Sequence, residues 1–119
     1  MRILLTILLL IGAAATSAEG PDPELREALR AAANESPSFI DRFEAEVWLT
    51  DMSRRLERQM RDPEERIELL QLVHMEARRV ELPPELILAV IDVESNFDRF
   101  AICVAVARGL MQIMQFWKE

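Results

Sequence analysis

Proline-led helix starts divide this chain of 119 residues into short segments, and they limit the folds that it can adopt more than any other feature. Asp22-Pro23 and Asp62-Pro63 each join an N-cap residue to a proline that fits the first helical turn. Pro83-Pro84 opens another segment in the same way. The alternation of apolar and polar residues that indicates strands is hard to find. The sequence therefore predicts an all-α fold.

Apolar residues between these starts recur at helical spacing. We expect helices over residues 23–33, 38–60, 63–80 and 84–95, and a further helix that begins around residues 104–109. The second and third helices should each turn one apolar side toward the core. The residues on those sides are Ala45, Trp48, Leu49, Met52, Leu56 and Met60, followed by Ile67, Leu70, Val73 and Ala77.

The first 18 residues have the features of a secretory signal peptide. Arg2 supplies a positive charge, Ile3 to Ile11 form an apolar segment too short to span a bilayer comfortably, and small residues lead to a cleavage site after Ala18. No cysteine lies near that site to carry a lipid. We therefore expect a periplasmic protein of the cell envelope that has no stable membrane anchor once the signal is cleaved.

Composition and charge exclude several functions. The net charge of −7 argues against nucleic acid as a partner. His74 is the only histidine and Cys103 the only cysteine, so we expect no metal site and no cofactor. We expect His74 to be partly exposed on its helix beside Arg78. Cys103 has apolar neighbours and is expected to be buried.

Three carboxylates lie at the end of the apolar helix over residues 84–95, in the stretch Asp92 to Asp98. Helical spacing places Glu94 with apolar residues, whereas Asp92 lies on a mixed face and Asp98 beyond the helix. An apolar setting and the negative end of the helix dipole would both favour the neutral acid, the form that a general acid needs. The alternative is a carboxylate that reaches into solvent from a frayed helix end. The pattern leaves both interpretations open.

Two linked motifs extend this pattern. The run LPPELILAVIDVESNFD is followed, at matching spacing, by GLMQIM. Together they resemble the catalytic domain of bacterial lytic transglycosylases of the soluble (SLT) type, which have a goose-lysozyme-like helical fold. The resemblance covers about residues 81–117. It implies a partial SLT domain over residues 63–119, which follows the signal peptide 1–18 and an N-terminal helical region 19–62.

The resemblance implies a reaction and a set of residues. Such enzymes cleave the β-1,4 bond between N-acetylmuramic acid and N-acetylglucosamine in peptidoglycan without water, and leave a 1,6-anhydro end. Glu94 matches their single catalytic acid and base, and Ser95 matches a residue that supports the acid by hydrogen bonding. Gln112 matches a position that lines the sugar-binding groove, and Met111 is expected beneath that groove. Phe97 is expected to anchor the core.

The chain also departs from the family pattern. Cys103, Val106 and Gln115 stand where Ser, Gly and Pro are usual, and Val106 would be strained if the backbone there has a positive φ. The family continues beyond the point where this sequence stops, with further helices and an Ala-Tyr-Asn-Ala-Gly-like motif, whereas this sequence has no tyrosine. We expect a truncated domain with exposed core faces and weak or no activity. The alternative function is a non-catalytic helical envelope protein that binds glycan or an unidentified protein partner.

Overall fold

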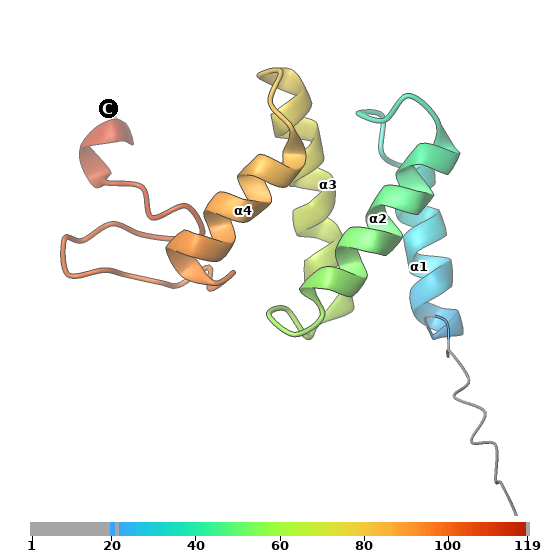
Figure 1. Ribbon diagram of the computed structural model, residues 1–119, viewed down its shortest axis with the longest axis horizontal. Coiled ribbons are helices and arrows are strands. Elements are labelled where there is room, and N and C mark those ends of the chain that lie inside the picture. The colour runs from blue at the N-terminus through green and yellow to red at the C-terminus, as the bar shows by residue number, and fades with distance from the viewer. Residues whose placement is uncertain (1–19, 21, 119) are drawn as a thin grey trace, which may run out of the picture.

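The computed structural model describes residue 20 and residues 22–118. Four α-helices follow one another, α1 (Pro23–Asn34), α2 (Arg42–Leu56), α3 (Pro63–Arg79) and α4 (Pro84–Ser95), and a short 3-10 helix, η1 (Gln115–Lys118), ends the chain (Figure 1). The described residues form no strand, and their only β-type pairings are isolated bridges between residues 102 and 108 and between residues 108 and 113. The prediction of an all-α fold is therefore confirmed.

The start of α3 shows how local sequence sets the helix boundaries. One oxygen of Asp62 accepts hydrogen bonds from the backbone N–H groups of Glu64, at 2.9 Å, and Glu65, at 3.1 Å, while Pro63 occupies the first turn. This cap satisfies N–H groups that have no partner inside the helix. Pro23 opens α1 as predicted, although Asp22 makes no side-chain hydrogen bond to that helix.

The second helix is shorter than the periodicity predicted. It was expected over residues 38–60, but α2 begins at Arg42 because the side chain of Asp41 caps it, accepting from the N–H of Glu44 at 2.8 Å. At the other end, residues 57–59 form a turn after Leu56. The apolar spacing continues through that turn to Met60, which is buried without being helical.

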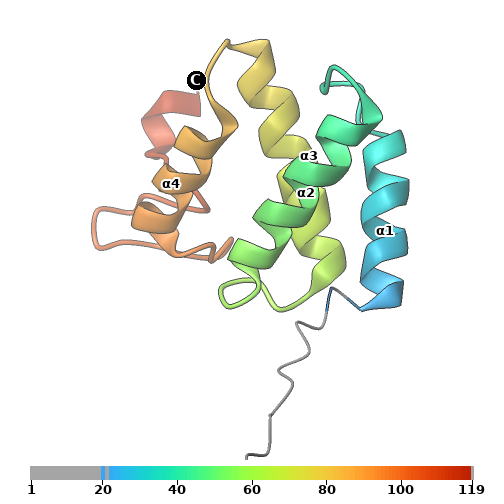
Figure 2. The same ribbon diagram turned by 45° about the vertical axis from the view of Figure 1, so that its right-hand side comes forward.

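All four helices contribute to one core. α1, α2 and α3 pack against one another, and α4 packs on α3 at the side away from α1 (Figure 2). Each helix supplies a side chain that is at most 2% exposed: Leu29, Leu49, Leu70 and Ile91. The apolar sides predicted for the second and third helices are the sides that face this core, with Trp48 and Met52 partly buried at its edge.

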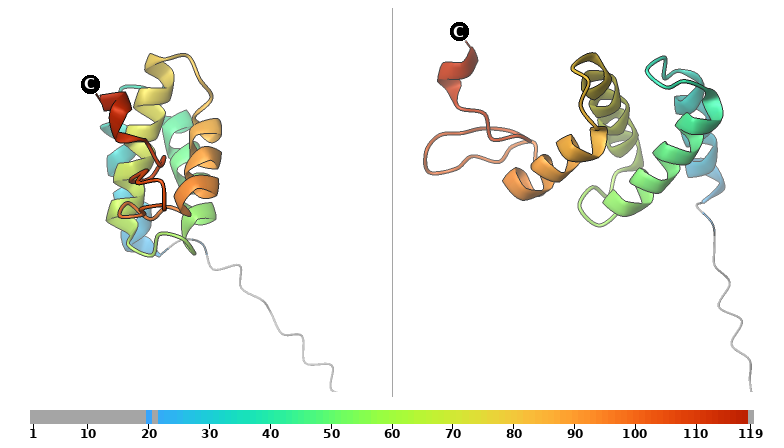
Figure 3. Two further views of the ribbon diagram at one scale, coloured as in Figure 1. Left: turned by 90° about the vertical axis from the view of Figure 1, so that its left-hand side faces the viewer. Right: turned by 45° about the horizontal axis from the view of Figure 1, so that its top comes forward.

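After α4 the backbone becomes irregular and extends away from the bundle (Figure 3). The helix expected from residues 104–109 is absent. Val106 and Gly109 have φ angles of 64° and 76°, which no right-handed helix contains, and the segment folds back on itself instead. Cys103 is exposed, so the prediction of a buried thiol was wrong. Eight large apolar side chains of this segment are exposed: Phe100, Ile102, Val104, Val106, Met111, Ile113, Phe116 and Trp117.

The proposed signal peptide over residues 1–18 lies outside the described residues. Within the part of the chain that is described, none of the helices has the length and apolar character needed to cross a bilayer.

Candidate active site

The candidate site begins where α4 ends. Its apolar sequence buries Leu88 and Ile91 against α3, and Asn96 stops the helix in the left-handed conformation, with φ 49°. The N–H of Asn96 donates to the carbonyl oxygen of Asp92 at 3.0 Å, which closes the last turn. Phe97 is also left-handed, with φ 64°, and this corner directs its ring into the core, where it is 6% exposed. Phe97 is therefore the core anchor that the sequence predicted.

Glu94 lies on the outside of this helix end. Its side chain is exposed, as is that of Asp92, while the neighbouring Val93 is 84% exposed. The expected apolar setting is absent because burial along this side of α4, complete at Ile91 and partial at Val90, does not reach the last turn, where Glu94 lies. Of the two interpretations left open by the sequence, the structure has the carboxylate that reaches into solvent.

The other two polar residues of the motif make local hydrogen bonds. Ser95 donates from its hydroxyl to the carbonyl oxygen of Ile91 at 3.1 Å, one turn back in α4. Asp98 accepts from the N–H of Phe100 at 2.9 Å, which stabilises the turn after the helix, as predicted for a loop residue. Among the hydrogen bonds of the described residues, none links Ser95 to Glu94.

The Gly-Leu-Met-Gln motif folds back beside this corner. Gly109 donates its N–H to the carbonyl oxygen of Ala101 at 3.0 Å, in a conformation that favours glycine. The side-chain amide of Gln112 donates to the carbonyl oxygens of Ala101 and Gly109, both at 2.9 Å. Gln112 therefore holds the two sides of the segment together. Met111 is 41% exposed.

The departure at Val106 has the predicted consequence. This β-branched residue has φ 64°, in the region where a Cβ atom is crowded by its own backbone. It closes a turn in which its N–H donates to the carbonyl oxygen of Cys103 at 2.9 Å. The backbone at Val106 is therefore left-handed and strained.

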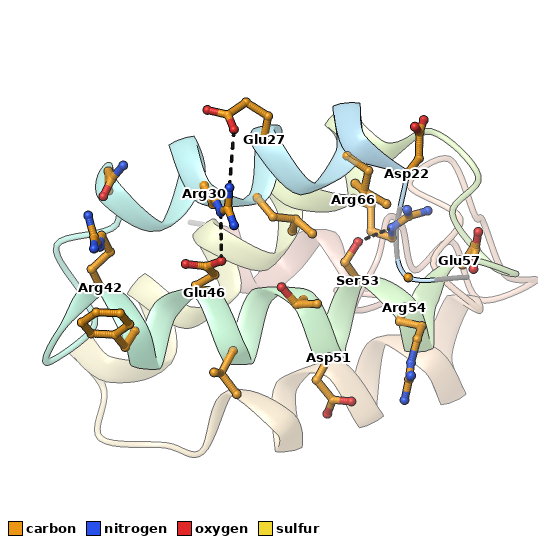
Figure 4. Close-up of a pocket in the computed structure, with 17 residues that line it drawn as sticks. Asp22, Glu27, Arg30, Arg42, Glu46, Asp51, Ser53, Arg54, Glu57 and Arg66 are labelled. Atoms are coloured by element: carbon orange, nitrogen blue, oxygen red, sulfur yellow. Dashed lines mark hydrogen bonds and ion pairs between the residues drawn. The ribbon is translucent and has the colours of Figure 1, made fainter. Parts of the chain in front are cut away.

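One hollow of the surface lies between α1 and α2, with a volume of about 1290 Å³ (Figure 4). Arg30 bridges its two sides through Glu46, at 3.3 Å, and lies 4.0 Å from Glu27. Deeper in, the guanidinium of Arg66 is 2% exposed and donates to the Ser53 hydroxyl at 2.9 Å. Cationic and anionic side chains both line this hollow, and Glu94 does not.

Comparisons with known proteins bear on the second half of the chain. Residues 71–118 match the family model of the transglycosylase SLT domain. The resemblance drawn from the two motifs is thereby confirmed, and the match is to an SLT-type lytic transglycosylase domain that is represented in part. It takes in the last part of α3, all of α4, and the segment that carries Gln112. No curated protein and no solved structure matches the chain.

Sequence reasoning misplaced His74 and did not find its surroundings. His74 was expected on a partly exposed face but is 6% exposed, with its ring stacked on Phe39 at 3.5 Å between centroids. Ser38 lies 2.8 Å from its Nδ1 atom. A usable signal existed, because His74 follows Leu70 by one turn on the apolar side of α3. The described residues contain no group of three His, Cys, Asp or Glu side chains that could hold a metal ion.

Proposed function

We propose that the chain is a lytic transglycosylase that cleaves the β-1,4 bond between N-acetylmuramic acid and N-acetylglucosamine in peptidoglycan. The observation that carries the proposal is the SLT match over residues 71–118, which includes the whole of α4 and its terminal Glu94. The accessibility of Glu94 supports this role, since a general acid must reach the glycosidic oxygen.

The proposed reaction uses Glu94 twice. As an acid it gives a proton to the oxygen of the leaving N-acetylglucosamine while the bond from that oxygen to the muramic C1 breaks. As a carboxylate it then takes the proton of the muramic C6 hydroxyl, whose oxygen bonds to C1 and closes the 1,6-anhydro ring. The proton is returned to Glu94 and no water is consumed, so one carboxylate serves both steps, unlike the carboxylate pair of most glycosidases.

Asp92 and Asp98 need no part in this reaction. Asp92 is exposed two residues before Glu94, which places it on a different side of α4. Asp98 holds the turn through the N–H of Phe100. Ser95, Met111 and Gln112 remain our predicted substrate contacts, and contact with sugar would be in addition to the local hydrogen bonds that Ser95 and Gln112 make.

We place the proposed activity in the periplasm, on the grounds of the signal features in residues 1–18. Glycan strands are the proposed partner, and neither a cofactor nor a metal is required by the chemistry. The surplus of negative charge continues to argue against nucleic acid.

The proposal is tested by incubating the chain that begins at Glu19 with purified glycan strands and identifying the released ends by mass spectrometry. Anhydro ends are expected, each lighter by one water than a hydrolysis product. Glu94→Gln should reduce their release by about 100-fold or more while glycan binding and the helical circular dichroism persist. Asp92→Asn is the matched control, and an equal loss in both variants would contradict a specific role for Glu94.

The lack of an apolar setting around Glu94, which would have favoured its neutral acid form, favours the second candidate, a non-catalytic envelope protein that binds glycan or a protein partner. In that case glycan strands bind but no new ends are released, and Glu94→Gln leaves binding unchanged. The same experiment therefore separates the two functions.

A further inference from the structure

A second hollow, of about 560 Å³, lies at the end of the bundle where α2 starts, α3 ends and α4 starts. The connections from α1 to α2 and from α3 to α4 both lie at this end (Figure 2). Neither Glu94 nor any residue after α4 lines it. The lining residues are Phe39, Glu44, Trp48, His74, Arg78, Glu81, Leu82, Pro83, Pro84 and Glu85.

Three rings form a fixed wall of this hollow. Phe39 and His74 are stacked, at 9° between planes, and Trp48 meets His74 edge-on with centroids 5.1 Å apart. The indole N–H of Trp48 donates to Glu85 at 2.7 Å, which ties α2 to the first turn of α4. Contacts from three helices therefore hold the imidazole and one carboxylate in place.

One ring nitrogen of His74 has no hydrogen-bond partner among the described residues. Its Nδ1 is engaged with Ser38, whereas among the described residues no hydrogen bond is formed by its Nε2. No buried side-chain nitrogen or oxygen in the described part of the chain lacks a partner, so Nε2 must be accessible to solvent although the residue is 6% exposed. His74 is one of the residues that line the hollow, and in the tautomer that carries its proton on Nδ1 and donates it to Ser38, Nε2 is a hydrogen-bond acceptor.

The charges around this atom are mostly negative. Glu44, Glu81 and Glu85 line the hollow against the single cation Arg78. Glu44 and Glu85 line the same hollow as the His74 ring. One oxygen of Glu44 accepts from the N–H of Ile40 at 3.0 Å, and one oxygen of Glu85 accepts from Trp48. Each carboxylate has a second oxygen that can accept from an occupant.

We propose that this hollow binds a primary ammonium group, which donates its three N–H bonds to Glu44, Glu85 and the Nε2 atom of His74. An ammonium has three donors and no acceptor, which matches three acceptors beside an aromatic wall. Arg78 lies at the same hollow and suits a ligand whose carboxylate accompanies the amine.

The natural source of this amine depends on the proposed function. If the chain acts on peptidoglycan, the free amino groups of the peptides attached to the glycan are available in the same polymer. Glu85 and Glu94 are about 14 Å apart along α4, at 1.5 Å per residue. A strand could then be held by its peptide at one end of α4 while its sugar lies at the other. A small free amine is the alternative source of the same group.

The binding experiment uses the chain from Glu19 onward and three probes: a soluble disaccharide-peptide with a free side-chain amine, the same compound with that amine acetylated, and n-butylamine. Titration calorimetry measures affinity, and nuclear magnetic resonance follows the indole N–H of Trp48. We expect the free amine to bind at least about tenfold more tightly than the acetylated compound. Tighter binding of the disaccharide-peptide than of n-butylamine identifies the polymer as the source, and equal binding identifies small amines.

Glu85→Gln should weaken binding of the free amine by about tenfold or more. Glu68→Gln, an exposed residue of α3 outside the hollow, is the matched control and should change nothing. Equal affinity for the free and acetylated compounds, absence of binding, or an unchanged affinity in Glu85→Gln would each overturn the proposal. The titration is repeated in Glu94→Gln, because amine binding that persists in a chain without glycan cleavage separates this site from the proposed reaction.

Discussion

The ring of Phe39 lies flat on the imidazole of His74, with centroids 3.5 Å apart, and so joins the connection before α2 to the middle of α3. Stacking of this kind covers a face of the imidazole and takes most of the ring out of the solvent that would stabilise its charged form. Burial, reinforced by the positive charge of Arg78, lowers the pKa of His74 below the ordinary value of 6.5, and the carboxylates of Glu44 and Glu85 offset this only in part.

Stability should therefore depend on pH through His74. Below pH 6.5 the unfolded chain takes up a proton on this residue while the folded chain does not, so the free energy of unfolding falls as the pH falls. The contribution is complete above pH 6.5 and is lost as the pH falls through the folded pKa, at no more than about 1.4 kcal/mol per pH unit for one proton. Urea unfolding at about pH 7.5 and about pH 5 measures it, and His74→Gln should have the smaller pH dependence.

Arg66 should be the arginine whose loss costs most stability. It is 2% exposed and donates to the hydroxyl of Ser53, at 2.9 Å, and to the carbonyl oxygen of Met60, at 2.5 Å. Arg66→Ala leaves both acceptors buried without this donor, at a cost of about 1–3 kcal/mol each, so we expect a loss of about 3 kcal/mol in the free energy of unfolding. Arg58→Ala, at an exposed position, should change it by less than about 0.5 kcal/mol. Similar losses in the two variants would contradict this view of Arg66.

Replacing Val106 by glycine should stabilise the segment after α4. The residue is held at φ 64°, where valine is strained by about 1–3 kcal/mol and glycine is not. The gain, reduced by the extra freedom of glycine when unfolded, should be about 1 kcal/mol. Hydrogen exchange of the Cys103 and Ile113 amides reports on this segment, because both donate within it. Val104→Gly, at a position without a positive φ, should speed exchange or leave it unchanged.

Gln112 can be tested for two separate roles. Gln112→Met keeps the length of the side chain but removes the donor to Ala101 and Gly109, so the amides of Arg108 and Ile113 should exchange at least about tenfold faster. Glycan binding is measured on the same variant. Faster exchange with unchanged binding assigns Gln112 to the local structure alone, and lost binding with unchanged exchange assigns it to substrate.

The thiol of Cys103 should react in the folded protein. It is exposed in the segment between Ile102 and Val104, both of which are also largely exposed. Dithionitrobenzoate should therefore label one thiol per chain without denaturant, at a rate within about tenfold of that in urea. A labelling rate that rises by several orders of magnitude on unfolding would instead indicate that Cys103 is buried, as its apolar neighbours suggested.

The positions at which helices start could be predicted, because the signals for a helix start lie in neighbouring residues. The cap and proline at Asp62-Pro63 and the prolines at Pro83-Pro84 act on neighbouring backbone, and the starts of α3 and α4 were predicted from them. The segment around Val106 could not be predicted in the same way. Its turns depend on pairing between residues 102, 108 and 113, and apolar composition alone made it resemble a helix.

Features of the site that depend on position along the chain were predicted correctly. Features that depend on how the elements pack, such as the exposure of a side chain, were not. The core role of Phe97 and the turn at Asp98 are confirmed. The apolar setting of Glu94 is wrong, because the packing that buries Ile91 on the same helix side does not extend to Glu94, one turn further on. His74 was misplaced because its partner Phe39 lies far away in the sequence.

The left-handed corner at Asn96 and Phe97 has a mechanical consequence. The ring of Phe97 is buried in the core. Its position therefore fixes which way the side chains of the last turn of α4 face. Each residue of an α-helix turns by about 100°, so adding or deleting one residue before Phe97 would swing Glu94 to another side of the molecule. The direction in which the Glu94 carboxylate faces therefore depends on an aromatic side chain three positions further along the chain.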